Sequence, residues 1–192
     1  MLVDYRLLVK FLKENKVLSN NGELIEIGSF LGGGTKILAQ YADKFEKKVY
    51  AIDVFNINFD KTINLSGNKM SELYSNHFGG KPENQWEIFQ NNISDLKNII
   101  VIKEDSKKVM LPSNTQFCFG FIDGNHESTY VYSDFNLIWS NLISEGALAF
   151  HDYNGDLPNV TDSINEIVLK YNDEIKKIDY IPDQFIIILT KK

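Results

Sequence analysis

Two aspartates and two histidines stand where long apolar runs end, and these residue types can do chemistry. Asp123 closes the run FCFGFID, and His126 follows it. His151 and Asp152 close the run GALAFHD. Imidazole titrates near neutral pH and suits proton transfer, whereas carboxylates bind hard divalent cations. The pattern therefore predicts proton transfer or cation binding at a shared site.

A glycine-rich stretch, IEIGSFLGGGTKILA at residues 25–39, predicts a nucleoside-binding turn. A phosphate-binding loop needs a lysine followed by a hydroxyl residue, but here the order is Thr35 and then Lys36. A dinucleotide turn needs a small residue where Phe30 stands. The preceding Glu26 would repel a pyrophosphate and attract a cation. A cationic nucleoside without phosphate fits this segment, and S-adenosylmethionine is such a ligand.

The elements that must position these residues alternate between apolar runs and helical patterns. Strands are expected at 23–28, 48–54, 98–105, 117–124, 146–152 and 184–192. Helical spacing is expected between them, for example at Val131, Phe135, Ile138 and Leu142. Apolar strands that alternate with helices predict an α/β fold with a parallel sheet covered on both faces. The carboxyl ends of the strands then share one edge, where ligands bind.

Two further segments complete the expected organisation of a single domain over residues 1–192. Residues 1–15 form an amphipathic helix. Its apolar stripe allows either packing within the chain or a homodimer. Residues 56–90 are longer than one connection needs and contain the aromatic residues Phe59, Tyr74 and Phe78 as well as His77. We interpret this insertion as a lid over the active edge.

Composition excludes several classes of function. The 192 residues carry a net charge of −6, with a pI near 5.1, which argues against nucleic acid as a partner. The N-terminal helix carries charges among its apolar residues and predicts neither a signal peptide nor a membrane span. We expect a cytoplasmic protein. The single cysteine, Cys118, lies in an apolar run and is expected to be a buried structural thiol.

Four segments together resemble class I S-adenosylmethionine-dependent methyltransferases. They are EIGSFLGGGT, the strand-end Asp53, the loop KEDS, and FIDGNHESTYVYSDFNLIWSNLISEGALAFHDY. The last segment resembles the branch of small-molecule and sugar O-methyltransferases (methyltransferase family 24-like). The resemblance covers about residues 22–192 and leaves the insertion unmatched. It implies a Rossmann-like, mostly parallel seven-stranded sheet with helices on both faces and an antiparallel last strand.

The resemblance also implies which residues bind S-adenosylmethionine. Asp53 would hold the ribose hydroxyls. Asp105 would accept a hydrogen bond from the adenine amino group, with Ser106 close by. The complete expected set is Glu26, Gly28, Ser29, Gly32, Gly34, Thr35, Asp53, Val54, Asp105, Ser106 and Asp123.

Asp123, His151 and Asp152 are the expected metal ligands. Oxygen donors favour Mg²⁺, whereas a histidine ligand favours Mn²⁺. Metal-dependent relatives often carry two acidic or amide residues where this chain has His151 and Asp152, so the third ligand stays open. His151 either completes the site, acts as a base or orients Asp152. His126 stands where relatives have a lysine and is the first candidate for the general base, its alternative role being a cap on the following helix.

The leading hypothesis is O-methylation of a small polar acceptor, such as a sugar or a natural-product hydroxyl. A second hypothesis keeps the cofactor without the metal, with His126 or His151 acting alone. A nicotinamide-dependent oxidoreductase is a third, but Phe30 and the lack of a lysine–tyrosine pair count against it. A non-catalytic nucleoside-binding module is the fourth.

Overall fold

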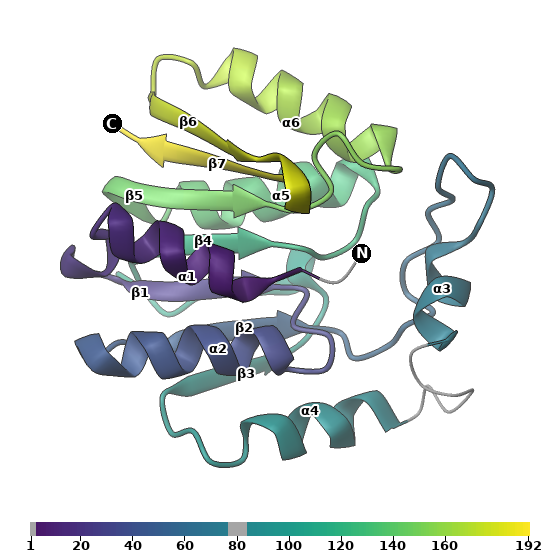
Figure 1. The fold of residues 1–192 in the computed structure, drawn as a ribbon, viewed down its shortest axis with the longest axis horizontal. Coiled ribbons are helices and arrows are strands. Elements are labelled where there is room, and N and C mark those ends of the chain that lie inside the picture. Colours follow the sequence, from purple (N-terminus) through teal and green to yellow (C-terminus); the bar gives the residue numbers. More distant parts are fainter. Residues whose placement is uncertain (1–2, 77–83) are drawn as a thin grey trace.

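A seven-stranded sheet forms the centre of the computed structural model, which describes residues 3–76 and 84–192 (Figure 1). Its strand order is β3-β2-β1-β4-β5-β7-β6. The strands are β1 Glu23–Ile27, β2 Val49–Asp53, β3 Ile99–Lys103, β4 Phe117–Ile122, β5 Leu142–Phe150, β6 Ile175–Ile181 and β7 Ile186–Lys191. Strands β1 to β5 pair in parallel, and β7 is antiparallel to both β5 and β6. The expected sheet with an antiparallel last strand is confirmed.

Two details differ from the sequence-based expectation. Strand β6, with the sequence IKKIDYI, was not among the expected strands because it lies at the sheet edge and most of its side chains are exposed. Leu142 begins β5, whereas its spacing suggested a place on the preceding helix, which ends at Trp139. A buried residue just after the end of a helix fits both the helical and the strand pattern of apolar residues. Spacing alone therefore does not assign Leu142 to the helix or to the strand.

Helices cover both faces of the sheet. On one face lie α1 (Tyr5–Glu14), α2 (Gly33–Ala42) and α4 (Gln85–Ile93), and on the other lie α5 (Ser128–Trp139) and α6 (Pro158–Lys170). Leu24 packs with α1 and α2, whereas its neighbour Ile25 packs with α5 and α6. Successive strand residues point to opposite faces, and both faces are buried. This is why the strands read as continuous apolar runs.

The site forms at the carboxyl edge, where the chain reverses its order across the sheet. From β1 the chain moves outward through β2 and β3, and β4 then returns to the other side of β1. This reversal leaves a crevice beside the ends of β1 and β4. The insertion lies at the same edge, where it forms an isolated bridge between Ile63 and Lys69 and the helix α3 (Met70–Asn76) (Figure 1). His77 and Phe78 lie outside the described residues.

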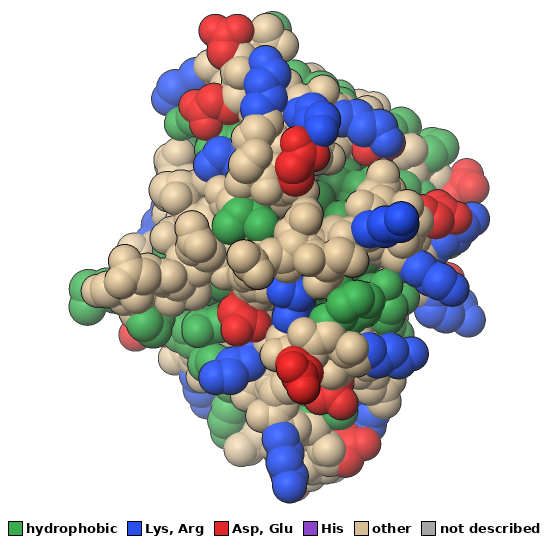
Figure 2. Space-filling model, turned by 90° about the vertical axis from the view of Figure 1, so that its left-hand side faces the viewer, with side chains coloured by type: hydrophobic (Ala, Val, Ile, Leu, Met, Phe, Trp, Pro, Cys, Tyr) green, Lys and Arg blue, Asp and Glu red, His purple; other side chains and the backbone are tan. Residues whose placement is uncertain are grey.

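The opposite end of the molecule, at the amino ends of the parallel strands, has a mixed surface. Figure 2 shows Lys and Arg side chains interspersed there with Asp and Glu, and hydrophobic side chains between them. No helix within residues 3–76 and 84–192 is both long and apolar enough to cross a membrane.

Candidate active site

A cavity of about 710 Å³ opens at the carboxyl edge of the sheet. Its walls come from the loops that follow β1, β2, β3, β4 and β5, and from the insertion. Seven of the residues expected to bind the cofactor line this cavity: Gly28, Ser29, Gly34, Asp53, Val54, Ser106 and Asp123. The carboxyl-edge site that the sequence predicts is therefore one continuous space.

Gly28 brings the glycine-rich turn against the end of β4. Its φ angle of 92° lies in the left-handed region, and an added Cβ would lie 1.9 Å from the carbonyl oxygen of Asp123. The backbone N–H of Asp123 donates to the carbonyl of Ile27 at 2.8 Å. Only glycine allows this close backbone approach. The contact places Asp123 beside the turn.

Asp53 ends β2 and faces the cavity from the opposite side of the turn. Its two carboxylate oxygens accept backbone N–H groups, from Phe30 at 2.8 Å and from Phe55 at 2.6 Å. Burial raises the pKa of Asp53 to about 6, although these N–H groups oppose the shift. Phe30 and Phe55 both adopt positive φ angles, of 48° and 52°. Two strained residues thus hold the Asp53 carboxylate in one orientation.

Glu26 lies beneath the cavity and does not line it. Its side chain is fully buried, and the Thr35 hydroxyl donates to Oε2, whereas Oε1 has no hydrogen-bond partner among the described residues. Burial raises the pKa of Glu26 to about 7, and the hydrogen bond from the Thr35 hydroxyl opposes part of the shift. Thr35 is likewise buried. Glu26 and Thr35 thus support the turn from below.

Gly32 and Asp105 also stand outside the cavity wall. Gly32 is the N-cap of α2, and an added Cβ would meet Phe89 at 2.8 Å. The Asp105 carboxylate accepts the backbone N–H of Lys107 at 3.0 Å, so it caps the short 3-10 turn at residues 106–108. Its neighbours Glu104 and Ser106 line the cavity instead. A direct adenine contact from Asp105 stays a prediction.

Buried polar atoms without partners indicate that this half of the cavity fits a nucleoside ligand. Ser29 Oγ and Gln85 Oε1 have no hydrogen-bond partner among the described residues, although both residues line the cavity. Buried polar groups are normally paired, so such atoms suit a ligand with hydroxyl and amino groups. Gly33 and Gly34 at the start of α2 also line the cavity, and a Cβ on Gly33 would meet nothing within 4 Å. A helix N-terminus favours a carboxylate. S-adenosylmethionine carries all of these groups.

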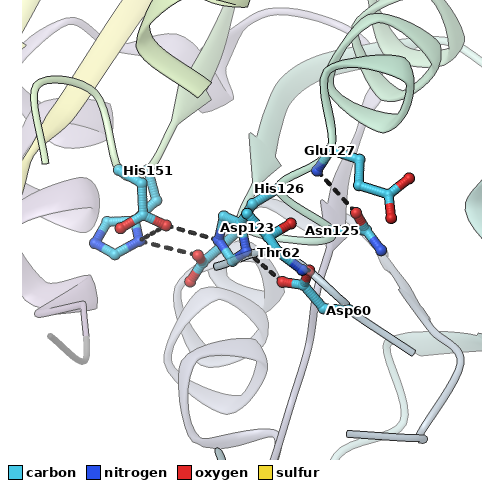
Figure 3. Close-up of polar contacts among 8 residues, drawn as sticks. Asp60, Thr62, Asp123, Asn125, His126, Glu127 and His151 are labelled. Carbon is cyan, nitrogen blue, oxygen red and sulfur yellow. Dashed lines mark hydrogen bonds and ion pairs between the residues drawn. The ribbon is translucent and has the colours of Figure 1, made fainter. Parts of the chain in front are cut away.

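The other half of the cavity holds a row of alternating carboxylates and imidazoles, formed by Asp60, His126, Asp152, His151 and Asp123, which we call the acid–imidazole row. His126 lies between two acids. Its Nδ1 lies 2.5 Å from Asp60 (Figure 3), and its Nε2 lies 2.8 Å from Asp152. His151 Nδ1 lies 2.9 Å from Asp123 and 3.1 Å from Asp152. One continuous hydrogen-bonded row therefore joins the insertion to the end of β4.

The acids of the row favour the protonated form of both histidines. Burial by itself lowers the pKa of His126, but Asp152 and Asp60 outweigh it and raise the pKa to about 9. Burial likewise opposes protonation of His151, but Asp123 and Asp152 raise its pKa to about 10. The same hydrogen bonds lower the pKa of Asp152 against the effect of burial.

A general base needs access to the substrate and a free ring nitrogen, and the contacts of His126 provide neither. Its side chain is 4% exposed, and it does not line the cavity. With a proton on both ring nitrogens it donates two hydrogen bonds and has no lone pair for a substrate proton. His151 and Asp152 do line the cavity. Asp152 has a φ angle of 61°, a strained conformation that orients its carboxylate into the row.

The site has the donors that a divalent cation needs. Asp123, His126 and Asp152 each offer one ligand atom, and these atoms lie within 4.8 Å of one another. The sequence predicted His151 in place of His126, and in the structure His151 Nδ1 contacts both carboxylates. Two carboxylates with one imidazole suit Mg²⁺ or Mn²⁺. The residues therefore fit a metal once the ligating imidazole has lost a proton, because only a neutral imidazole has a lone pair for a cation.

Sequence reasoning missed several residues of the cavity wall. Asp60, Gln85, Glu104 and Tyr5 line it. Of these, only Glu104 stands in a recognised motif, the loop KEDS, where Asp105 and Ser106 were the expected contacts. Tyr74 was noted only as an aromatic residue of the insertion, and its ring lies 5.6 Å from that of Phe30. Only the folded chain places these residues together.

Comparisons with known proteins agree with this geometry. The sequence family described as a methyltransferase domain matches residues 25–153. The matched segment runs from β1 to just beyond Asp152 and so includes the turn, Asp53 and the whole acid–imidazole row. A comparison with curated proteins finds no match.

Solved structures of low sequence identity share the fold. The O-methyltransferase NovP has a TM-score of 0.68 at 15% identity, covering 98% of this chain and 78% of NovP. CalS11, a TDP-rhamnose 3'-O-methyltransferase of calicheamicin biosynthesis, has a TM-score of 0.66 at 12% identity, covering 96% of this chain and 77% of CalS11. SMU.1697c, a putative methyltransferase from Streptococcus mutans in complex with SAH, has a TM-score of 0.57 at 17% identity, covering 100% of each chain.

Proposed function

Because this chain belongs to the family of methyltransferase domains, we propose that it transfers a methyl group from S-adenosylmethionine to a hydroxyl of a small polar acceptor. The observation that carries this proposal is that Asp53 and the pair Asp123 and His151 line one and the same cavity. A nucleoside held at Asp53 and a hydroxyl held at Asp123 then share that space. Such placement supplies the alignment on which the transfer depends.

The cofactor half of the cavity holds the donor. Asp53 accepts the ribose hydroxyls, the unpaired Ser29 and Gln85 atoms bind its polar groups, and the start of α2 receives its carboxylate. When bound, S-adenosylmethionine supplies a methyl group on a positively charged sulfur. The C–S bond breaks as the bond to the acceptor oxygen forms. The acceptor oxygen loses its proton in the same process.

The acid–imidazole row binds the acceptor hydroxyl and receives its proton. Asp123 Oδ2 has no hydrogen-bond partner in the described part of the chain, whereas Oδ1 is bound by His151. Asp123 is therefore the group that takes the proton, and His151 donates to and orients this carboxylate. This assignment replaces His126 as the base and gives His151 a supporting role.

We further propose that Asp123 and Asp152 hold Mg²⁺ or Mn²⁺ with one imidazole. When bound, the cation lowers the pKa of an acceptor hydroxyl. The support is the grouping of three donor atoms within 4.8 Å. Exhaustive chelation should abolish methyl transfer, and added Mg²⁺ or Mn²⁺ should restore it. Unchanged activity after chelation would favour the metal-free hypothesis.

The acceptor class is proposed from two structural neighbours and from the polar groups of the cavity. NovP is described as an O-methyltransferase, and CalS11 as an enzyme for TDP-rhamnose. We propose a sugar or natural-product hydroxyl for this chain, because its cavity offers carboxylates and an imidazole that hydrogen-bond to hydroxyls.

Calorimetric titration with S-adenosylhomocysteine tests the cofactor assignment, with NADH as the parallel control. Micromolar binding of S-adenosylhomocysteine alone supports the proposal, whereas binding of NADH alone would replace it with the oxidoreductase hypothesis. Asp123→Asn should retain S-adenosylhomocysteine binding within a few-fold and lose turnover with any acceptor found by screening. Binding without turnover across a broad acceptor screen would favour a nucleoside-binding module.

A further inference from the structure

Asp60 brings a charge from the insertion into the interior of the site. Its side chain is only 5% exposed, although the residue belongs to an irregular segment between β2 and α3. Oδ2 lies 2.5 Å from His126 Nδ1, and Oδ1 accepts the backbone N–H of Thr62 at 2.9 Å (Figure 3). Buried carboxylates are rare unless they are paired. The pairing with His126 is therefore the reason that this segment of the insertion is held against the site.

Two other contacts of the insertion are weaker. The Phe59 ring meets the edge of Tyr130 at 5.4 Å, and the backbone N–H of Leu65 donates to the carbonyl of Asp156 at 3.0 Å. Such contacts contribute about 1 kcal/mol each. The Asp60–His126 contact is a charge-assisted hydrogen bond between two buried side chains. Such hydrogen bonds are stronger than those between neutral groups.

The His126 ring links the position of Asp60 to the orientation of Asp152. Its imidazole is rigid and buried, and its two nitrogens point to acids on different elements. Without Asp60 the Nδ1–H would be buried and unpaired, which is costly. Rotation of the ring would relieve this cost, but the same rotation would break the 2.8 Å contact between Nε2 and Asp152. The two contacts of one ring are thus coupled.

We infer that Asp60 is a positioning residue, which acts through His126 to orient Asp152 while the insertion is docked. The inference rests on the proposed function for the part that Asp152 takes in the reaction. The insertion and the carboxylate at the end of β5 form one hydrogen-bonded unit. A site without a docked insertion would then have a misplaced Asp152.

The test compares Asp60→Ala and Asp60→Asn with Glu72→Ala. Glu72 is an exposed acid of the same insertion, and the contact of its side chain within the described residues is a surface ion pair with Lys69, so its removal is the matched control. Trypsin can cleave the insertion after the exposed Lys61 and Lys69. Asp60→Ala should raise this cleavage rate about tenfold or more, and Asp60→Asn, which keeps an acceptor, should raise it less. Glu72→Ala should cleave like the unmodified chain.

NMR signals of the imidazole N–H protons, recorded at one fixed pH, separate two roles of Asp60. It either orients Asp152 through His126 or only anchors the insertion. His126 should give two protected downfield N–H signals, from Nδ1 bound to Asp60 and Nε2 bound to Asp152, assigned by their loss in His126→Gln. Asp60→Ala should remove both signals, and Asp60→Asn should keep a weakened Nε2 signal. A thermal melt of each variant shows whether it is folded.

An Nε2 signal that survives in folded Asp60→Ala would overturn the inference, even if cleavage becomes faster, because Asp60 would then only anchor the insertion. Unchanged cleavage would overturn it as well. If Asp60→Ala does not fold, the same two readings are taken from Asp60→Asn, in which a weakened Nε2 signal and faster cleavage are expected. Titration of the unmodified chain with S-adenosylhomocysteine tests the proposed function independently of the cleavage rate and the N–H signals. Its failure would refute the proposed function and leave the coupling within the row standing.

Discussion

Replacing Gly28 by alanine should destabilise the fold strongly, because this glycine joins β1 to the end of β4. The left-handed φ of 92° costs alanine about 1–2 kcal/mol. The added Cβ would lie 1.9 Å from the Asp123 carbonyl oxygen, so the two loops must separate, at about 1–3 kcal/mol for overpacking. Separation also weakens the hydrogen bond from Asp123 to Ile27, worth about 1 kcal/mol. Together these effects predict a loss of roughly 3–6 kcal/mol.

Urea denaturation followed by tryptophan fluorescence measures this loss. Gly33→Ala is the matched control, since a Cβ at that glycine meets nothing within 4 Å and the residue is helical. The control should unfold at the same urea concentration or a higher one, because alanine is favoured over glycine in helices by about 1 kcal/mol.

S-adenosylhomocysteine affinity gives a second reading, since Gly28→Ala must displace Asp123 from the turn. A loss of less than about 1 kcal/mol in the free energy of unfolding of Gly28→Ala would refute the reasoning. An equal loss of unfolding free energy in Gly33→Ala would refute it too. Both glycines would then stabilise the fold only through general helix and turn propensity.

Three further outcomes follow from the structure. Glu26 has a pKa raised from 4.5 to about 7 by burial, so its contribution to the free energy of unfolding is complete below pH 4.5 and is lost as pH rises toward 7, by roughly 3 kcal/mol. Glu26→Gln should remove that part of the pH dependence in urea titrations, and an unchanged slope would contradict the assignment. Burial raises the pKa of Cys118 to about 11, so iodoacetamide at pH 8 should label the thiol only in urea, and rapid labelling of the native chain would contradict its burial. An added Cβ on Gly34 would lie 2.1 Å from the Tyr5 ring, so Gly34→Ala should cost about 1–3 kcal/mol, and Tyr5→Leu should recover most of that cost in a double-mutant cycle, whereas additive losses would show that the ring does not cause it.

The sequence by itself was enough to predict the parallel sheet and the carboxyl-edge placement of Asp53, Asp123 and Asp152. The reason is physical: strands buried on both faces must be apolar throughout, so a polar residue marks the point where each strand ends. The glycine-rich turn was readable for a similar reason, since Gly28 meets backbone where no side chain fits. Strand β6 escaped because an edge strand can be polar and carries no such signal.

Only the tertiary structure shows which side chains the histidines contact. Sequence placed His126 near Asp123 and so suggested a base, but a base needs a free lone pair, and that depends on contacts far away in the chain. Asp60 lies 66 residues before His126 and belongs to a segment without a periodic pattern. Hydrogen-bond geometry and burial set the pKa of an imidazole, and neither is encoded in local spacing. The same limit explains why Asp105 caps a turn while Glu104 beside it reaches the cavity: adjacent side chains point in different directions once the backbone is placed.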